Sequence, residues 1–291
     1  MTAPLFGPPR APDEYGYKST AEFPLMRRTG WKFLKRMARL GVAIFGGIGA
    51  RVYFLRDALR AMFTEGRTWL PLVVRQMRTI GVDSLPLTTI VAAFIGAVIA
   101  LQSRYQLFPG VQLSVVGLIS RQSIILELGP LLTALVLTGR VGARMTAEIG
   151  TMRVTEQIDA LETLAFDPIA YLVVPRLVAA TLMLPVLVVF ANAVGVGIAF
   201  FTAVLATDVT WQDFSAGLRI SFNLFQIVYS LLKATVFGTA IAFFCSYEGY
   251  IAEVGAEGVG RSTARAVVMT SVAILVLDAF IAALFAQQLQ G

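Results

Sequence analysis

Long, nearly uncharged apolar runs constrain the fold of this chain more than any other feature. Crossing about 30 Å of hydrocarbon takes about 20 apolar residues in a helix. Because the runs are continuous rather than alternating, they predict helices and not the strands of an outer-membrane barrel. We therefore expect an all-α integral membrane protein with five transmembrane helices. The runs cover about residues 85–101, 115–137, 171–206, 224–246 and 266–286.

The composition supports this class and excludes several others. Of 291 residues, 57% are hydrophobic and 14% are charged, whereas soluble domains carry about 25% charged residues. The chain has no histidine, which excludes histidine-based catalysis and histidine metal ligation. Its single cysteine, Cys245, lies in an apolar run and is expected to be a dispensable core residue. We attribute the net charge of +6 to basic cytoplasmic loops and expect no nucleic-acid partner.

Three parts are expected along the chain. Residues 1–25 hold five prolines and lack the apolar core of a signal peptide, so we expect them to be disordered or loosely docked. Residues 26–80 are basic and amphipathic, and their uncharged run is too short to cross a bilayer. This pattern favours a helix lying in the membrane interface, with an ordinary solvated helix as the alternative. Residues 81–291 form the transmembrane domain.

The third apolar run, 171–206, is too long for one upright crossing and too short for two crossings with a turn. We expect one tilted or kinked helix. Asp167 and Pro168 provide a start signal just before it. Residues 207–223 are expected to be an outer loop.

Orientation follows from the basic residues near the ends of the spans. The N-terminal segment, the link between the second and third spans and the link after the fourth span are rich in arginine and lysine. The opposite side has only three such residues, Arg104, Arg121 and Arg219. Because short cytoplasmic loops carry the excess of positive charge, we expect a cytoplasmic N-terminus and an outside C-terminus.

The link between the second and third spans predicts an amphipathic helix on the membrane surface. Arg140, Arg144 and Glu148 recur every four residues and share one helical face. From Glu148 to Leu164, apolar residues form a stripe beside polar ones. Such a helix either docks into the groove of a partner or is solvated without one. The stripe is Val154, Ile158, Leu161 and Ala165, and the polar set is Arg153, Glu156, Gln157, Asp159 and Glu162.

Away from the ends of the spans, three ionisable side chains fall inside the apolar runs, where charge is costly and marks functional candidates: Glu127, Lys233 and Asp278. Lys233 and Asp278 lie at a similar depth, roughly 12 Å from the outer ends of their helices, and are expected to form an ion pair. Glu127 has no obvious partner at its depth. It could face a hydrated cavity, be protonated, bond to backbone or serve a proton relay.

Residues 255–262, GAEGVGRS, nearly match the phosphate-binding loop pattern. Arg261 replaces the required lysine, no strand is expected before the motif, and a membrane span follows at once. We therefore reject nucleotide binding here, and any ATP dependence requires another subunit.

The sequence ELGPLLTALVLTGRVGARMTAEIGTMRVTEQIDALETLAFDPIAYLVVPRLVA, at 127–179, resembles the MlaE/YrbE family of ABC-transporter permeases, as do GAEGVGRSTARAVV and Leu277–Asp278. The resemblance extends from about residue 38 to the C-terminus. It implies five spans after an interfacial helix, and a second permease copy, identical or closely related. It also implies a cytoplasmic ABC ATPase that binds ATP and Mg, an outer MCE-domain protein and, in many systems, a small STAS-domain protein. The implied substrate is phospholipid or another lipid moved between the inner membrane and the outer envelope.

The resemblance also assigns residues. A lipid cavity between the two permease copies would be lined by Ile99, Gln102, Leu107 and Glu127. Leu126 stands where the family often has arginine, and Arg104 either replaces that charge or is an exposed loop residue. The ATPase would dock on the helix from Glu148 to Leu164, through Glu148, Arg153, Glu156, Gln157, Asp159 and Leu161.

These features predict a transport subunit with no catalytic residues and no cofactor of its own. One alternative is a proton- or ion-coupled secondary carrier that uses Glu127 and the Lys233–Asp278 pair. Against it, the odd number of spans shows no inverted-repeat halves. A structural membrane anchor for a larger assembly is the third hypothesis.

Overall fold

The structure, a computed structural model, describes residues 49–289. The chain divides into two compact units, residues 1–53 and 54–291. Of the first unit only residues 49–53 are described, and they are helical. The predictions for residues 1–25, and for residues 26–48 of the segment 26–80, lie outside the described residues.

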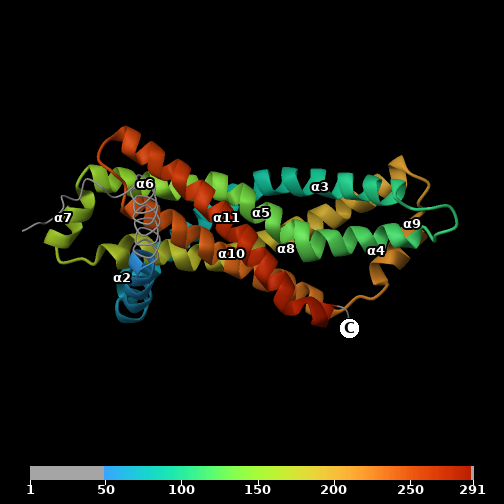
Figure 1. The fold of residues 1–291 in the computed structure, drawn as a ribbon, viewed down its shortest axis with the longest axis horizontal. Helices are drawn as coiled ribbons and strands as arrows, with labels where there is room; N and C mark the ends of the chain where they lie inside the picture. Colours follow the sequence, from blue (N-terminus) through green and yellow to red (C-terminus); the bar gives the residue numbers. More distant parts are fainter. Residues whose placement is uncertain (1–48, 290–291) are drawn as a thin grey trace, which may run out of the picture. The chain divides into compact units, whose positions relative to one another are not determined.

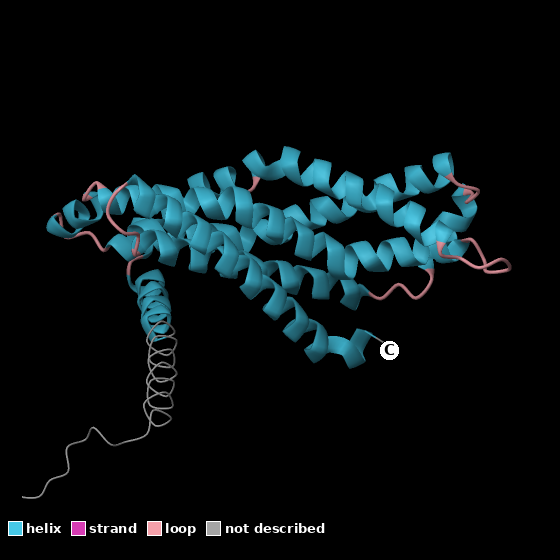
Figure 2. Cartoon of the chain, turned by 45° about the horizontal axis from the view of Figure 1, so that its top comes forward, coloured by secondary structure: helices cyan, strands magenta, loops and turns pink. Residues whose placement is uncertain are grey.

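The second unit is built from helices, and no strand occurs within residues 49–289 (Figure 2). Residues 54–64 are helical, and a 3-10 turn, Val82–Ser84, connects the next helix to the first long one. Three short π-helical segments, Ser123–Leu128, Thr138–Gly142 and Ile169–Val173, continue directly into α-helices. The α-helices are α2 (Gly66–Ile80), α3 (Leu85–Tyr105), α4 (Ser114–Gln122), α5 (Gly129–Leu137), α6 (Ala143–Val154), α7 (Gln157–Thr163), α8 (Val174–Ala206), α9 (Trp211–Arg219), α10 (Leu224–Tyr250) and α11 (Ala256–Leu289).

Five helical stretches within residues 49–289 are long and apolar enough to cross a membrane, which confirms the predicted fold class. The first begins earlier than expected, because α2 leads into α3 through the 3-10 turn without a loop. The stretches are Trp69–Tyr105, Ser114–Val154, Ile169–Ala206, Leu224–Tyr250 and Ala256–Gln288.

The second span is helical from α4 to α6 but changes its winding twice. A π-helical segment precedes Pro130, which lies in the first turn of α5 and cannot donate a backbone hydrogen bond. Such π-segments occur often at functional sites because they displace the side chains that follow. Glu127 lies inside this segment.

The third run is a single helix, α8, as predicted. The backbone N–H of Ile169 donates to Asp167 Oδ1 at 2.8 Å, so the aspartate supports the helix start. The outer loop expected at 207–223 is only partly a loop. It contains α9, whose start is fixed by reciprocal hydrogen bonds between Thr210 and Asp213.

Close packing centres on α8, which contacts α2, α3 and α10 (Figure 1). Gly96 of α3 lies against the backbone of Gly195 in α8, and any added Cβ would collide with it. Gly238 of α10 is similarly close to the Ala180 carbonyl of α8. Small residues allow membrane helices to approach and gain van der Waals contact.

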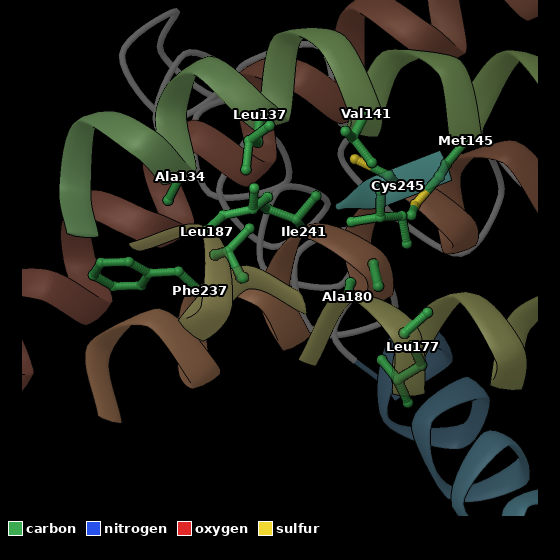
Figure 3. Packing of buried hydrophobic residues seen from close by; sticks show 14 of the residues in the cluster. Ala134, Leu137, Val141, Met145, Leu177, Ala180, Leu187, Phe237, Ile241 and Cys245 are labelled. Carbon is green, nitrogen blue, oxygen red and sulfur yellow. The ribbon is translucent and has the colours of Figure 1, made fainter. Parts of the chain in front are cut away.

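A buried apolar cluster joins the second span to α8 and α10 (Figure 3). Leu137 and Val141 face Leu187 and Ile241 in this cluster. Cys245 is fully buried there, as expected for a core residue.

Candidate functional site

Lys233 connects two acidic side chains inside the bundle. Its Nζ lies 2.6 Å from Glu127 Oε2 and 2.8 Å from Asp278 Oδ1. It also donates to the backbone carbonyl of Leu126 at 3.3 Å, and it lies 4.8 Å from the centre of the Tyr229 ring. We call Glu127, Lys233 and Asp278 the ion triad.

The structure corrects the expectation that Glu127 lacks a charged partner. Lys233 forms the expected pair with Asp278 and binds Glu127 as well. An ammonium group has three N–H donors, so one lysine can serve two carboxylates. The ion triad therefore connects the second, fourth and fifth spans at one point.

The triad is unequal in charge and in exposure. With all three groups ionised, one positive charge faces two negative ones. The Lys233 side chain is fully buried, whereas that of Glu127 is 43% exposed. Glu127 is thus the member that a solute beside the bundle can reach.

The four predicted lipid-cavity residues lie in different surroundings within residues 49–289. Ile99 and Gln102 lie near the C-terminal end of α3. Leu107 packs against an apolar cluster that includes Phe214 of α9. Glu127 instead belongs to the ion triad.

Arg104 is held by an ion pair at the C-terminal end of α3. Its Nη2 donates to Asp208 Oδ2 at 2.6 Å, and its Nε donates to the other carboxylate oxygen. The hydrogen bond from Arg104 lowers the pKa of Asp208. This pairing makes Arg104 a link between the first span and the end of the third.

Arg121 forms a second link, near α9, which the sequence did not reveal. It is buried in α4 and donates to Gln226 Oε1 at 2.7 Å and to the Ile220 carbonyl at 2.9 Å. The guanidinium also lies 5.3 Å from the centre of the Phe222 ring. It fixes the connection between α9 and α10.

The predicted helix from Glu148 to Leu164 is wrong as a single element. It is divided into α6 and α7 by a break at Glu156, which has a φ of 57°. The Thr155 hydroxyl donates to the Thr151 carbonyl at 2.8 Å, and Gln157 Nε2 donates to the Thr155 hydroxyl at 3.0 Å. Polar side chains that bond to nearby backbone compete with continuous helix in this way.

Across the break, Arg153 Nη1 donates to Asp159 Oδ1 at 2.7 Å and holds α7 against α6. Ile158 is buried and Leu161 packs beside it. Five of the six predicted coupling residues therefore lie together at this corner, and α7 and α9 lie at opposite ends of the bundle (Figure 1).

An exposed apolar pair follows α7 and was not singled out from the sequence. Leu164 is 68% exposed and Phe166 is 49% exposed. Between them Ala165 has a φ of 60°, and the N–H of Phe166 donates to the Leu161 carbonyl at 3.0 Å. This helix-ending motif turns the chain sharply and presents both side chains.

Glu148, the sixth predicted coupling residue, does not lie at this corner and pairs with two arginines instead. It accepts from Arg144 Nε at 2.7 Å and from Arg176 Nη2 at 3.2 Å. A cavity of about 340 Å³ lies beside it, lined by α2, α6 and the start of the third span. The contribution of α2 to this place could not be predicted from sequence spacing.

The glycine-rich stretch at 255–262 is not a phosphate loop. Gly255 has a φ of 96° and α11 begins at Ala256. No strand precedes it in residues 49–289. The glycine permits the tight turn into the last span.

Comparison with known proteins identifies the fold's relatives. The family described as "Permease MlaE" matches residues 73–284. The chain belongs to the MlaE permease family. It is therefore an ABC transporter permease, a multi-pass membrane protein and a transport subunit rather than an enzyme.

Individual relatives cover nearly the same part. A probable ABC transporter permease protein of Rickettsia prowazekii is 40% identical over 222 residues, 75% of this chain and 84% of the relative. One of Synechocystis is 38% identical over 239 residues, 81% of this chain and 89% of the relative. The intermembrane phospholipid transport system permease protein MlaE of Haemophilus influenzae is 31% identical over 253 residues, 87% of this chain and 97% of the relative.

Proposed function

We propose that this permease moves phospholipid between the inner membrane and the outer envelope, as the membrane subunit of an ABC transporter. The observation that carries the proposal is the similarity to the Haemophilus protein, whose name states phospholipid transport and which is covered almost completely. The membership of the MlaE permease family supports the same role. Two permease copies would enclose the lipid cavity, and an outer MCE-domain protein would exchange lipid with it.

In this proposal the chain lies in the inner membrane with a cytoplasmic N-terminus and an outside C-terminus. The distribution of arginine supports this orientation. Helix α7 is then cytoplasmic, whereas α9 and the Arg104–Asp208 ion pair face the outside. A STAS-domain protein would join the cytoplasmic side.

The ATPase would dock on α7 and the residues just after it. The surface combines exposed Leu164 and Phe166 with the carboxylates of Glu156, Asp159 and Glu162. An apolar pair with a charged rim suits insertion into a groove of a partner. ATP and Mg would be bound by that partner and not by this chain.

Movement of the ATPase would reach the lipid cavity through the second span. This span runs as one helical stretch from Ser114 to Val154 and carries Glu127 in its first half. The cavity between two copies would be lined by Ile99, Gln102, Leu107 and Glu127. Binding of ATP would favour one shape of this cavity over another, as any ligand shifts a two-state equilibrium.

Lys233 does not take the place of the arginine that the family often has at the position of Leu126, because the lysine side chain is fully buried. Its ammonium group binds the Leu126 carbonyl and the carboxylates of the ion triad. The cavity would therefore present the partly exposed carboxylate of Glu127 to lipid. This favours headgroups that carry hydrogen-bond donors.

A proton-coupled carrier is the second candidate, and the unequal charge of the ion triad favours it. One ammonium with two carboxylates can accept a proton within the bundle. Such a carrier would work under a pH gradient without ATP.

The deciding experiment is capture of an ATPase by full-length tagged permease from its own membranes. We expect a subunit with a Walker motif to co-purify with the wild type and to be lost in Glu156→Lys/Asp159→Lys. Glu253→Lys is the matched control, because Glu253 is an exposed acid outside α7 that pairs with Arg261. If the wild type captures no ATPase, the ABC mechanism fails.

A further inference from the structure

The cavity beside Glu148 is enriched in positive charge. It has a volume of about 340 Å³ and is bounded by α2, α6 and the start of the third span. Its lining contains three arginines and one acid, Glu148, a formal excess of two positive charges. The lining residues are Leu72, Arg75, Gln76, Thr79, Arg144, Glu148, Met152, Tyr171, Leu172, Pro175 and Arg176.

The hydrogen bonds inside the chain leave much of this positive charge unmatched. One carboxylate oxygen of Glu148 accepts a hydrogen bond from Arg144, and the other accepts one from Arg176. Arg176 is buried, and its Nη1 donates to the Leu172 carbonyl at 2.6 Å. Its Nε is buried and finds no hydrogen-bond partner within residues 49–289.

Arg75 is the third arginine and comes from α2. Its side chain is exposed, and no carboxylate in the described part of the chain lies within ion-pair distance of it. A guanidinium offers planar N–H donors that match the oxygens of a phosphate group. Arg75, Arg144 and Arg176 therefore face one space with the chemistry of a phosphate site.

The surroundings of the cavity are apolar, which distinguishes it from a site for a free anion. On α8, Leu182 and Val186 are exposed and lie two and three turns after Pro175 on the same helical face. A polar recess beside this exposed apolar face of α8 fits a molecule with a charged head and hydrocarbon chains.

We propose that this cavity binds the phosphate headgroup of an anionic phospholipid in the cytoplasmic leaflet. The leaflet assignment rests on the orientation given under the proposed function. The site is separate from the cavity between two permease copies, because none of Ile99, Gln102, Leu107 or Glu127 lines it. A volume of this size suits a small ligand group. A lipid bound there would hold α2 against α6, the helix that leads to the ATPase-docking corner.

Binding of a defined lipid to purified full-length permease in detergent tests the site. The probes are phosphatidylglycerol, phosphatidylcholine and inorganic phosphate, and the readout is binding followed by native mass spectrometry and by the lipid-induced rise in melting temperature. We expect phosphatidylglycerol to bind and stabilise. Phosphatidylcholine and inorganic phosphate at equal concentration should do neither.

Arg75→Gln is the test variant and Arg78→Gln is its matched control. Both arginines are exposed on α2, but only Arg75 lines the cavity. We expect Arg75→Gln to weaken phosphatidylglycerol binding by about tenfold, the effect of losing one charge-assisted contact, with an unchanged melting temperature in the absence of lipid. Arg78→Gln should bind like the wild type.

Three results would overturn the proposal. The headgroup site is contradicted if phosphatidylglycerol and phosphatidylcholine bind equally, or if Arg75→Gln and Arg78→Gln lose phosphatidylglycerol binding to the same extent. Inorganic phosphate that stabilises as well as phosphatidylglycerol makes it a free-anion site. The cavity is a protein interface if it binds no lipid and if Arg75→Gln abolishes capture of the ATPase subunit. Failure of ATPase capture with Arg75-dependent lipid binding retained would reject the proposed function and leave this site standing.

Discussion

Lys233 concentrates more polar interaction than any other buried residue described in the bundle. It is one of the largest fully buried side chains, and it holds Glu127 and Asp278 from two other spans. The depth of residues within apolar runs was enough to predict its pairing with Asp278. The contact between Lys233 and Glu127 was not predicted, because matching charges by their depth gives each charge one partner, whereas an ammonium group can bind two carboxylates.

Replacing Lys233 with methionine is expected to destabilise the bundle strongly. The change leaves Glu127 and Asp278 without their cation, and removal of one partner from a buried ion pair costs about 3–5 kcal/mol. The measurement is the thermal unfolding of the purified variant in detergent.

The triple variant Lys233→Met/Glu127→Gln/Asp278→Asn is the control for this prediction. It removes the two charges that the single change strands, so most of the lost stability should return. A single variant as stable as the wild type would show that the ion triad does not join the three spans.

The ion pair of Arg104 and Asp208 has a pH dependence of known sign. Because Arg104 lowers the pKa of Asp208, the ion pair is fully present above the ordinary aspartate pKa of about 3.9 and is lost as the pH falls through the lowered value. We expect Asp208→Asn to loosen the turn that follows α3 at pH 6, as acid should in the wild type.

The loosening of this turn can be measured as the mobility of a nitroxide spin label attached at Phe108→Cys, in a Cys245→Ala background. Phe108 is exposed in the turn that follows Arg104. The wild type and Asp208→Asn should differ at pH 6 and converge below the lowered pKa. Identical mobility at pH 6 would contradict the stabilising role of this ion pair.

Among the elements, α8 could be predicted and the corner at α7 only in part. The length of an apolar run fixes how many crossings it allows, so one long helix followed from residues 171–206. The break at Glu156 and the exposure of Phe166 depend on local hydrogen bonds that amphipathic spacing does not encode. Helix α9 was missed because residues 207–223 were interpreted as a loop, although Thr210 and Asp213 form a capping box and Trp211, Phe214 and Leu218 recur at helical spacing.

The contact between α3 and α8 yields a sharp prediction at this scale. Gly96→Ala places a methyl group against the Gly195 backbone, which cannot move without parting the two helices. Overpacking of this kind costs about 1–3 kcal/mol. The melting temperature of the purified protein measures the loss.

Gly197→Ala serves as the control on the same pair of helices. Nothing lies within 4 Å of a Cβ added at Gly197, so its melting temperature should stay unchanged or rise slightly. Equal melting temperatures for the two variants would mean that the helices do not depend on the close approach at Gly96.

At the scale of the whole molecule, one helical stretch joins three places of interest. The second span carries Glu127 of the ion triad in its first half, whereas the arginine-lined cavity and the corner of α6 and α7, where we propose that the ATPase docks, lie toward its C-terminal end. Five spans could be predicted from run lengths. The cavity could not, because it depends on α2 packing beside α8 and the π-helical segment Ile169–Val173, which are distant in sequence.

ATP-dependent lipid transfer by the assembled transporter tests the central claim most directly. Vesicles containing the permease with its captured partners would be supplied with fluorescent phospholipid, and transfer would be followed with ATP, without ATP and under an imposed pH gradient. We expect transfer only with ATP, and none in Glu156→Lys/Asp159→Lys. Transfer driven by the pH gradient without ATP would contradict the account and favour the proton-coupled carrier.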